Sequence, residues 1–167
     1  DLHKTYRQEG PGSPDVSLEE GVDLLRKFDH ECKQFQKKRE ELVKAQTLFN
    51  LPIQSYPELL QLERDLRLLA QVYKVFQDHS AMVTEYSSAM WSKVDIAALA
   101  KSAEEFDKFV HRMPKETKEL GELTTFHKLE EVVSSFKTSV PLIQQLKSDA
   151  IRPMHWEELM RIAGMDA

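Results

Sequence analysis

The sequence predicts an all-α fold, an elongated antiparallel bundle of long helices followed by short C-terminal helices. From Glu58 to Trp91, apolar residues recur at alternating three- and four-residue steps, which is the spacing of one helix face. Charged residues make up 31% of the 167 residues and glycines number only 5, as is typical of solvated helices. A helix of this length would extend about 50 Å and must pack its apolar edge on other helices.

The beginning of the chain is expected to form a flexible polar lead-in over residues 1–16. Two glycines and two prolines fall within residues 10–14, a composition that disfavours regular structure. The first helix is predicted to begin after Ser17, because Glu20 three residues later completes a capping box. Its apolar edge consists of Leu18, Leu25, Phe28, Cys32, Phe35, Leu42 and Phe49.

A basic residue, Arg39, interrupts this edge. Its aliphatic stem can lie along apolar surface while its charge reaches water. The run 37–41 is interpreted as a solvated helix face, because acidic residues follow the basic ones within a turn. The helix should end near Phe49, since Pro52 and Pro57 bias their predecessors away from helical angles.

The second helix is predicted to begin just after the connection. Ser55 and Glu58 have the spacing of a capping box, and Pro57 fits the first turn, where its missing N–H costs nothing. Because the connection is short, the first two helices should be antiparallel neighbours with their apolar edges facing each other.

Packing of the second helix should loosen beyond Phe76. Ser80 and Ser87 stand where leucine would be expected on its edge. The exposed end at Met90 and Trp91 is therefore a possible contact with a partner, although Trp91 could instead fold back onto the third helix. The other edge residues are Leu59, Leu62, Leu66, Leu69, Tyr73 and Val83.

A third helix is predicted after Asp95, which is a suitable N-cap. Met113 and Pro114 should end or kink it, so residues 17–113 comprise a long helical hairpin plus a third helix. The apolar stripe of this helix is Ile96, Leu99, Ala103, Phe106 and Val110.

Residues 114–167 are predicted to form a C-terminal helical part. A fourth helix should run from about Lys115 until Pro141 breaks it, and Gly121 should weaken it by roughly 1 kcal/mol relative to alanine. Short helices should follow on either side of Arg152–Pro153. The stripe of the fourth helix is Leu120, Leu123, Phe126, Leu129, Val133, Phe136 and Val140.

The composition narrows the function classes. A net charge of −5 argues against nucleic acid or an anionic membrane as the main partner, and no run of 18 apolar residues is present. The single cysteine, Cys32, excludes an internal disulfide, fits a reducing compartment, and is interpreted as a small apolar residue of the first helix. Because the chain begins with Asp1 and lacks a signal-peptide pattern, we expect a segment of a longer protein.

Side chains that could support catalysis are scattered. The six histidines include no HExxH motif or helical pair at metal-ligand spacing; His127 is interpreted as a surface residue and His155 as a structural or N-cap residue. A glycine-rich phosphate loop is absent, and the carboxylates have lysines or arginines nearby. We therefore expect no catalytic residue, no metal ligand and no cofactor within this segment.

Two groups of residues carry a family resemblance. The run 140–159, with Val140-Pro141-Leu142-Ile143, Leu146, Arg152 and the pair His155-Trp156 in this order, resembles the linker of dynein heavy chains. Leu48-Phe49-Asn50-Leu51-Pro52 and Tyr56-Pro57-Glu58-Leu59 are similar to a segment found especially in axonemal members. The resemblance covers about residues 15–164. It assigns a structural role to Pro141, Leu142, Ile143, Leu146, Arg152, His155 and Trp156, with Trp156 expected to pack near Leu142, Ile143 or Leu146.

The resemblance implies the N-terminal portion of the linker, at its junction with the tail. In this family the linker is a helical arm across a ring of six AAA+ modules, which binds ATP and Mg²⁺ and lies C-terminal to this segment. The segment would transmit force in an ATP-driven microtubule motor without catalysing a reaction. The implied partners are its own ring, dynein intermediate and light chains or neighbouring heavy chains, and microtubules through distant domains. The implied locations are the cytoplasm and the ciliary axoneme.

A second class of function stays open on the residues alone. The chain could be a non-motor helical scaffold or adaptor, such as a spectrin-like or tethering module. Spectrin-like repeats have matching tryptophan positions, whereas Trp91 and Trp156 do not stand in equivalent helical contexts. An enzyme is the least favoured class.

Overall fold

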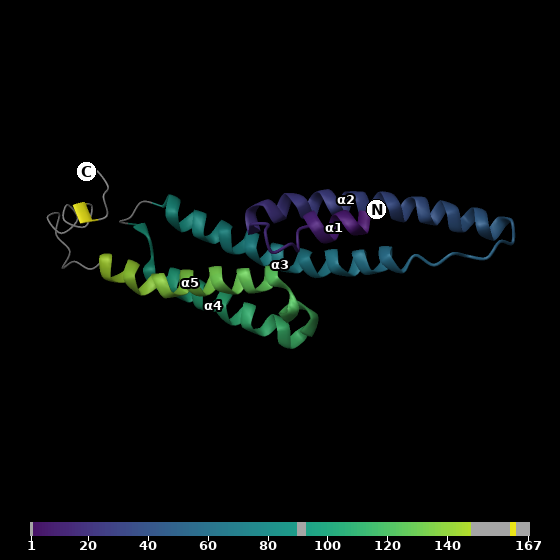
Figure 1. The fold of residues 1–167 in the computed structure, drawn as a ribbon. Helices are drawn as coiled ribbons and strands as arrows, with labels where there is room; N and C mark the ends of the chain where they lie inside the picture. Colours follow the sequence, from purple (N-terminus) through teal and green to yellow (C-terminus); the bar gives the residue numbers. More distant parts are fainter. Residues whose placement is uncertain (1, 90–92, 148–160, 163–167) are drawn as a thin grey trace.

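A computed structural model describes residues 2–89, 93–147 and 161–162 of the chain. Over these residues the structure contains helices and no strand, and the molecule is elongated (Figure 1). This confirms the prediction of an all-α bundle of long helices. The elements are α1 (Leu2–Glu9), α2 (Leu18–Leu48), α3 (Pro57–Ser88), α4 (Ile96–Glu116), the 3-10 helix η2 (Lys118–Glu122) and α5 (Thr124–Leu146).

The longest helix, α3, runs through the middle of the molecule. Helices α1 and α2 lie along its first part, whereas α4 and α5 lie along its later part (Figure 1). Helix α2 is antiparallel to α3, as the short connection predicts. Because its two ends contact different helices, α3 connects the two halves of the bundle.

Both ends of α2 have the local chemistry that fixes a helix boundary. The Ser17 hydroxyl accepts a hydrogen bond from the Glu20 N–H at 3.2 Å, and the Glu20 carboxylate accepts one from the Ser17 N–H at 3.3 Å, which confirms the capping box. At the other end, Asn50 has a φ of 51°, and the Leu51 N–H donates to the Gln46 carbonyl at 2.8 Å. This is a Schellman end, in which asparagine tolerates the left-handed conformation.

The start of α3 differs from the sequence prediction. Its N-cap is Tyr56, without a side-chain capping bond, so the expected capping box of Ser55 and Glu58 is wrong. Pro57 does occupy the first turn. The residue before a proline is held in extended conformations, which places the cap at Tyr56 rather than one residue earlier.

The apolar interior consists of two clusters. The larger one draws side chains from all six helical elements, and its bulkiest fully buried members include Tyr73, Phe28 and Phe126. The smaller one is built on Leu99, Ala103 and Val140, with partly buried side chains of α3 packed against it, namely Met82 and Tyr86.

The apolar edge of α2 is buried over only part of its length. Leu18, Phe28 and Cys32 are buried, whereas Phe35 and Leu42 are exposed. The two predicted edges therefore face each other near the middle of the molecule but not along the whole hairpin.

The prolines of α4 and α5 lie inside helices. Helix α4 continues through Pro114 to Glu116, and the expectation that Pro141 breaks the last helix is wrong, because α5 continues to Leu146. Val140 is buried against Leu99 and Ala103, with Ile143 packed beside them. This packing offsets the cost of an interior proline, about 3 kcal/mol.

The segment between α4 and α5 is also not the continuous helix that was expected from Lys115. It contains η2, and α5 begins at Thr124. At Gly121 an added Cβ would lie 3.3 Å from the Cβ of Pro114, so the turn of η2 passes closely over the end of α4. Gly121 thus allows a tight return of the chain instead of weakening a long helix.

The first described residues of the chain contain a helix that the sequence analysis did not predict. Helix α1 forms, and Tyr6 is buried against Phe28, with ring centroids 5.5 Å apart and planes at 77°. Residues 10–16 do lack regular structure, as their glycines and prolines predict. The apolar ring of Tyr6 provides the contact that holds α1 on the bundle. The polar average composition of this segment does not predict that contact.

Candidate functional site

The later half of α3 meets α4 and α5 around a buried histidine. His79 is only 2% exposed, and its ring contacts Phe106 of α4 and Phe136 of α5 edge-to-face at 5.3 and 5.2 Å. Burial lowers the pKa of His79, so the ring is neutral near pH 7. Its Nε2 atom has no hydrogen-bond partner among the described residues. The histidine therefore acts here chiefly as an aromatic spacer between three helices.

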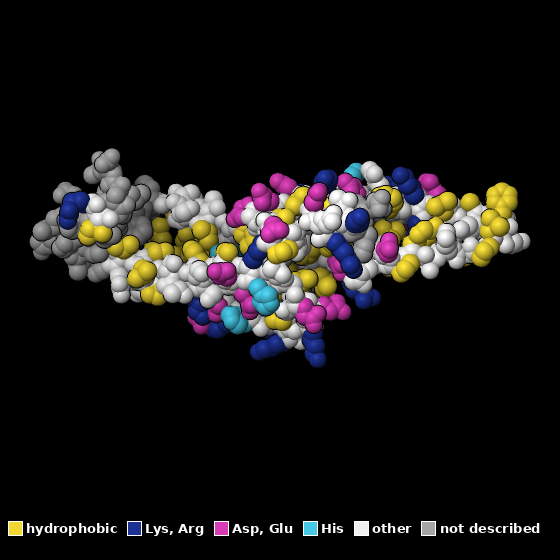
Figure 2. Space-filling model, viewed as in Figure 1, with side chains coloured by type: hydrophobic (Ala, Val, Ile, Leu, Met, Phe, Trp, Pro, Cys, Tyr) yellow, Lys and Arg dark blue, Asp and Glu magenta, His cyan; other side chains and the backbone are white. Residues whose placement is uncertain are grey.

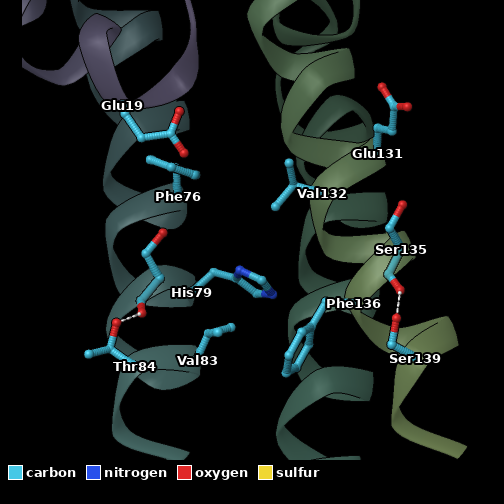
Figure 3. A pocket seen from close by; sticks show the side chains of 11 residues that line it. Glu19, Phe76, His79, Val83, Thr84, Glu131, Val132, Ser135, Phe136 and Ser139 are labelled. Atoms are coloured by element: carbon cyan, nitrogen blue, oxygen red, sulfur yellow. Dashed lines mark hydrogen bonds between the residues drawn. The ribbon is translucent and has the colours of Figure 1, made fainter. Parts of the chain in front are cut away.

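A groove of 590 Å³ lies beside this histidine, between α3 and α5. Figure 3 shows His79 projecting from α3 towards α5, where Val132 and Phe136 project back. The hydroxyls of Thr84 and Ser139 donate to carbonyls one turn earlier on their own helices, at 2.8 and 2.9 Å. These hydroxyl protons are thus engaged by the backbone, and the groove has the character of a packing seam rather than a catalytic site.

The residues of the predicted family motif fall partly within the described chain. Ile143 is partly buried and packs on the smaller cluster, whereas Leu142 is 60% exposed. Pro141 lies on the exposed side of α5, and Leu146 is partly buried at its end. Arg152, His155 and Trp156 lie outside the described residues, as do Met90 and Trp91, so their predicted roles stay predictions.

A contact that the sequence analysis missed joins the end of α5 to the start of α4. The Lys147 ammonium donates a hydrogen bond to the Val94 carbonyl. Asp95, one residue on, caps α4 by accepting bonds from the N–H groups of Ala97 and Ala98 at 3.0 and 3.1 Å, as predicted. The two residues are 53 positions apart, so no local sequence pattern predicts this hydrogen bond.

A second missed feature, the N-terminal clasp, consists of Tyr6, Pro11, Tyr73, Thr125 and Lys128. The Tyr73 hydroxyl donates to the Pro11 carbonyl at 2.5 Å, and the Thr125 hydroxyl donates to the same oxygen at 3.4 Å. The Lys128 ammonium donates to the carbonyls of Pro14 and Val16, at 2.7 and 2.6 Å. The clasp fastens the first sixteen residues to α3 and α5.

Tyr73 needs room to reach this carbonyl. An added Cβ at Gly21 would lie 1.9 Å from the Tyr73 Oη, so only glycine leaves the space. Burial raises the pKa of Tyr73 to about 12, which keeps the hydroxyl protonated and able to donate. A glycine inside a helix was the one sequence signal for this close approach.

Other groups with potential chemistry are structural or solvated. Burial, followed by the nearby Glu63 and Asp29 carboxylates, raises the pKa of the Cys32 thiol. The thiol therefore stays protonated, whereas a nucleophilic cysteine must form the thiolate. His127 is exposed, as expected, and lies 3.3 Å from the Glu130 carboxylate. In the described part of the chain, no three His, Cys, Asp or Glu side chains are placed to share a metal ion. None of the described helices has the length and apolar character needed to cross a membrane.

The comparison with protein families decides the relationship. The family model described as "Dynein heavy chain, N-terminal region 2" matches residues 59–167. The chain belongs to the dynein heavy chain family. The matched region of this dynein segment begins in the first turn of α3, so it contains α3, α4, η2 and α5, and it excludes α1 and α2.

Individual relatives match nearly the whole dynein segment. It is 36% identical over 166 residues to the Dynein-1-alpha heavy chain, flagellar inner arm I1 complex, of Chlamydomonas reinhardtii, which covers 99% of the segment. It is 34% identical over 157 residues, or 94% of the segment, to Dynein axonemal heavy chain 10 of Homo sapiens. The segment spans 4% and 3% of the lengths of these two relatives. The match to the Chlamydomonas chain therefore includes α1 and α2.

Proposed function

We propose that this segment transmits force at the junction between the tail and the linker of a dynein heavy chain. The observation that carries the proposal is the continuity of α3. This helix contributes Tyr73 to the larger cluster and packs Met82 and Tyr86 against the smaller one. A load applied at one end of the bundle would pass to the other through a single hydrogen-bonded rod supported by helices on both sides.

The wider setting of the proposal follows from the family. The parent chain would be an ATP-driven microtubule motor, with ATP and Mg²⁺ bound in a ring of AAA+ modules C-terminal to this segment. The matched relatives are named as axonemal or flagellar chains, which supports a place in the axoneme of a cilium. The ring, intermediate and light chains, or neighbouring heavy chains would be its partners. Family membership favours this role over a spectrin-like scaffold.

The test interrupts α3 between the two clusters. Ala81 is exposed on α3, so Ala81→Pro removes a helical hydrogen bond without removing a buried side chain. Ala81→Gln keeps the helix and serves as the matched control. Both are introduced into a full-length dynein heavy chain, and microtubule gliding velocity and ATP turnover are measured on the same preparations.

We expect Ala81→Pro to slow gliding severalfold while ATP turnover persists, because the stroke is absorbed at the break. Ala81→Gln should leave both unchanged. Unchanged gliding in the proline variant would overturn the proposal. Equal loss of gliding and turnover would also overturn it, since the segment would then support the ring itself rather than transmit its motion.

A further inference from the structure

Exposed apolar side chains gather at one end of the molecule, which we name the hairpin tip. It comprises α2 from Phe35 onwards, the connection 49–56 and the first turns of α3 to Leu62. Figure 2 shows apolar side chains there, at the end away from α4 and α5. Seven of the eleven large apolar side chains exposed among the described residues lie here, with exposures from 45 to 78%: Phe35, Leu42, Leu48, Phe49, Leu51, Ile53 and Leu60.

The tip is exposed because the bundle is thin there. The last turns of α2 extend past the start of α3, and beside them lies the non-helical connection rather than a helix (Figure 1). Helices α1, α4 and α5 lie elsewhere along α3. Consequently the apolar edge that is buried at Phe28 and Cys32 continues to Leu42 without a cover. An apolar area of this kind is typical of a surface that binds a partner.

A groove of 600 Å³ crosses the tip. On one side α2 contributes Phe35, Arg39 and Leu42, and on the other lie Pro57 and Leu59 at the start of α3. Phe35 and Leu42 lie two turns apart on α2, and Leu59 and Leu62 lie about one turn apart on α3, so each side presents apolar side chains along one helix face. Such a groove suits the ridge of another helix.

Arg39 brings to the groove a hydrogen-bond donor that a bound partner would have to satisfy. Its Nε atom is buried and has no hydrogen-bond partner among the described residues. A buried donor without an acceptor is costly, and a carboxylate is the acceptor that a guanidinium binds best, through two parallel hydrogen bonds. Lys38 lines the same groove, with its ammonium 5.4 Å from the centre of the Phe35 ring.

The charge of the tip also differs from that of the chain. Residues 35–62, which form the tip, contain four lysines and arginines against three acidic residues, whereas the whole chain has 23 basic and 28 acidic residues. The tip thus carries a small positive charge on an acidic molecule, and this charge complements an acidic partner.

We propose that the hairpin tip is a docking surface for an acidic amphipathic helix of another protein chain. The apolar face of that helix fills the groove between α2 and α3, and a carboxylate beside that face binds Arg39. This surface is distinct from the groove between α3 and α5 beside His79, and the proposal does not depend on the force-transmitting role of the segment.

The probes are two fluorescent peptides. One is a synthetic amphipathic helix with leucines on one face and glutamates flanking them, and the other carries lysines in place of the glutamates. Each is titrated with the 167-residue chain, and binding is followed by fluorescence anisotropy. We expect saturable binding of the glutamate peptide that is at least about tenfold tighter than binding of the lysine peptide.

Three variants locate the binding. Phe35→Asp and Arg39→Glu should each weaken binding of the glutamate peptide at least about tenfold, and Arg39→Glu should also tighten binding of the lysine peptide. Phe109→Asp is the matched control. Phe109 is 43% exposed against 45% for Phe35, and it too lies beneath a cation, Arg112, whose Cζ is 5.7 Å from the ring centre. Its replacement should leave binding unchanged, with circular dichroism confirming equal helix content in all variants.

Several results would overturn the proposal. These are failure of the glutamate peptide to bind, equal binding of both peptides, or an equal effect of Phe109→Asp and Phe35→Asp. Sedimentation that shows a dimer abolished by Phe35→Asp would assign the tip to a second copy of this chain instead. Preferential binding to phosphatidylserine vesicles, again lost in Phe35→Asp, would assign it to a membrane surface.

Discussion

At the scale of single residues, the buried Tyr73 hydroxyl is hydrogen-bonded, whereas the buried His79 imidazole is not fully satisfied by the part of the chain that the structure describes. Tyr73 reaches a carbonyl acceptor 62 positions away, whereas His79 has an Nε2 atom without a partner among the described residues. The hydroxyl fixes the position of the N-terminal segment. The imidazole instead makes the core sensitive to protons, because its charged form would be buried between two phenylalanine rings.

Replacing Tyr73 with phenylalanine should destabilise the protein by about 1–3 kcal/mol, because the buried Pro11 carbonyl loses its shorter hydrogen bond. Urea unfolding followed by circular dichroism measures this loss. The matched control is Tyr86→Phe at a partly buried tyrosine, which should change stability by less than about 0.5 kcal/mol. Equal effects of the two variants would show that the clasp does not depend on this hydroxyl.

The stability of the protein should fall in mild acid because of His79. Its folded-state pKa lies below that of an unfolded histidine, about 6.5, so the unfolded chain binds the proton first. The contribution is therefore intact above about pH 6.5 and is lost as the pH falls from there towards the lower folded-state value. Urea midpoints at about pH 7.5 and 5.5 should differ less in His79→Phe than in the natural sequence. The exposed-site variant His30→Gln should retain the full difference.

At the scale of helices, local chemistry accounts for the starts of α2 and α4 but not for the extent of α5. Ser17 and Asp95 cap their helices as their side chains predict, because a cap depends on residues within one turn. Pro141 is different. Whether a helix continues through proline depends on how much apolar surface the next turn buries, and this is set by α4, far along the chain.

Replacing Pro141 with alanine should stabilise the protein by roughly 1–2 kcal/mol. The change restores one helical hydrogen bond and removes a steric conflict, and these gains exceed the lost rigidity of the unfolded chain. Thermal unfolding measures the effect. Leu142→Ala, at a neighbouring exposed side chain, should leave the midpoint nearly unchanged. A lower midpoint for Pro141→Ala would show that α5 requires the proline.

At the scale of the whole molecule, periodicity predicted the architecture because long helices carry their packing face in their own sequence. Periodicity predicted neither the N-terminal clasp nor the packing of His79 between α3, α4 and α5. One aromatic residue, Tyr6, holds a segment whose average composition is polar, and its partners lie on other helices. His79 lies three residues beyond Phe76, and its burial depends on phenylalanines of α4 and α5 that no local pattern connects with it.

Amide hydrogen exchange tests the folded state of the first sixteen residues. Backbone N–H groups in the last turn of α1, and that of Ser13, which donates to the Gly10 carbonyl at 3.0 Å, should exchange more slowly than in an isolated peptide of residues 1–16. Tyr6→Ala should abolish this protection, because the burial of Tyr6 holds α1 in place. Equal exchange rates in the whole chain and the isolated peptide would support the flexible lead-in that the sequence predicts.

The uneven thickness of the bundle has a mechanical consequence. Helices α3, α4 and α5 lie together around His79, whereas at the far end of the hairpin tip only the end of α2 and the non-helical connection 49–56 of the described chain remain (Figure 1). The bending rigidity of a beam increases steeply with its cross-section. The molecule is therefore stiffer around His79 than at the hairpin tip. A pull on the tip would bend the connection 49–56 before it deformed the packed helices around His79.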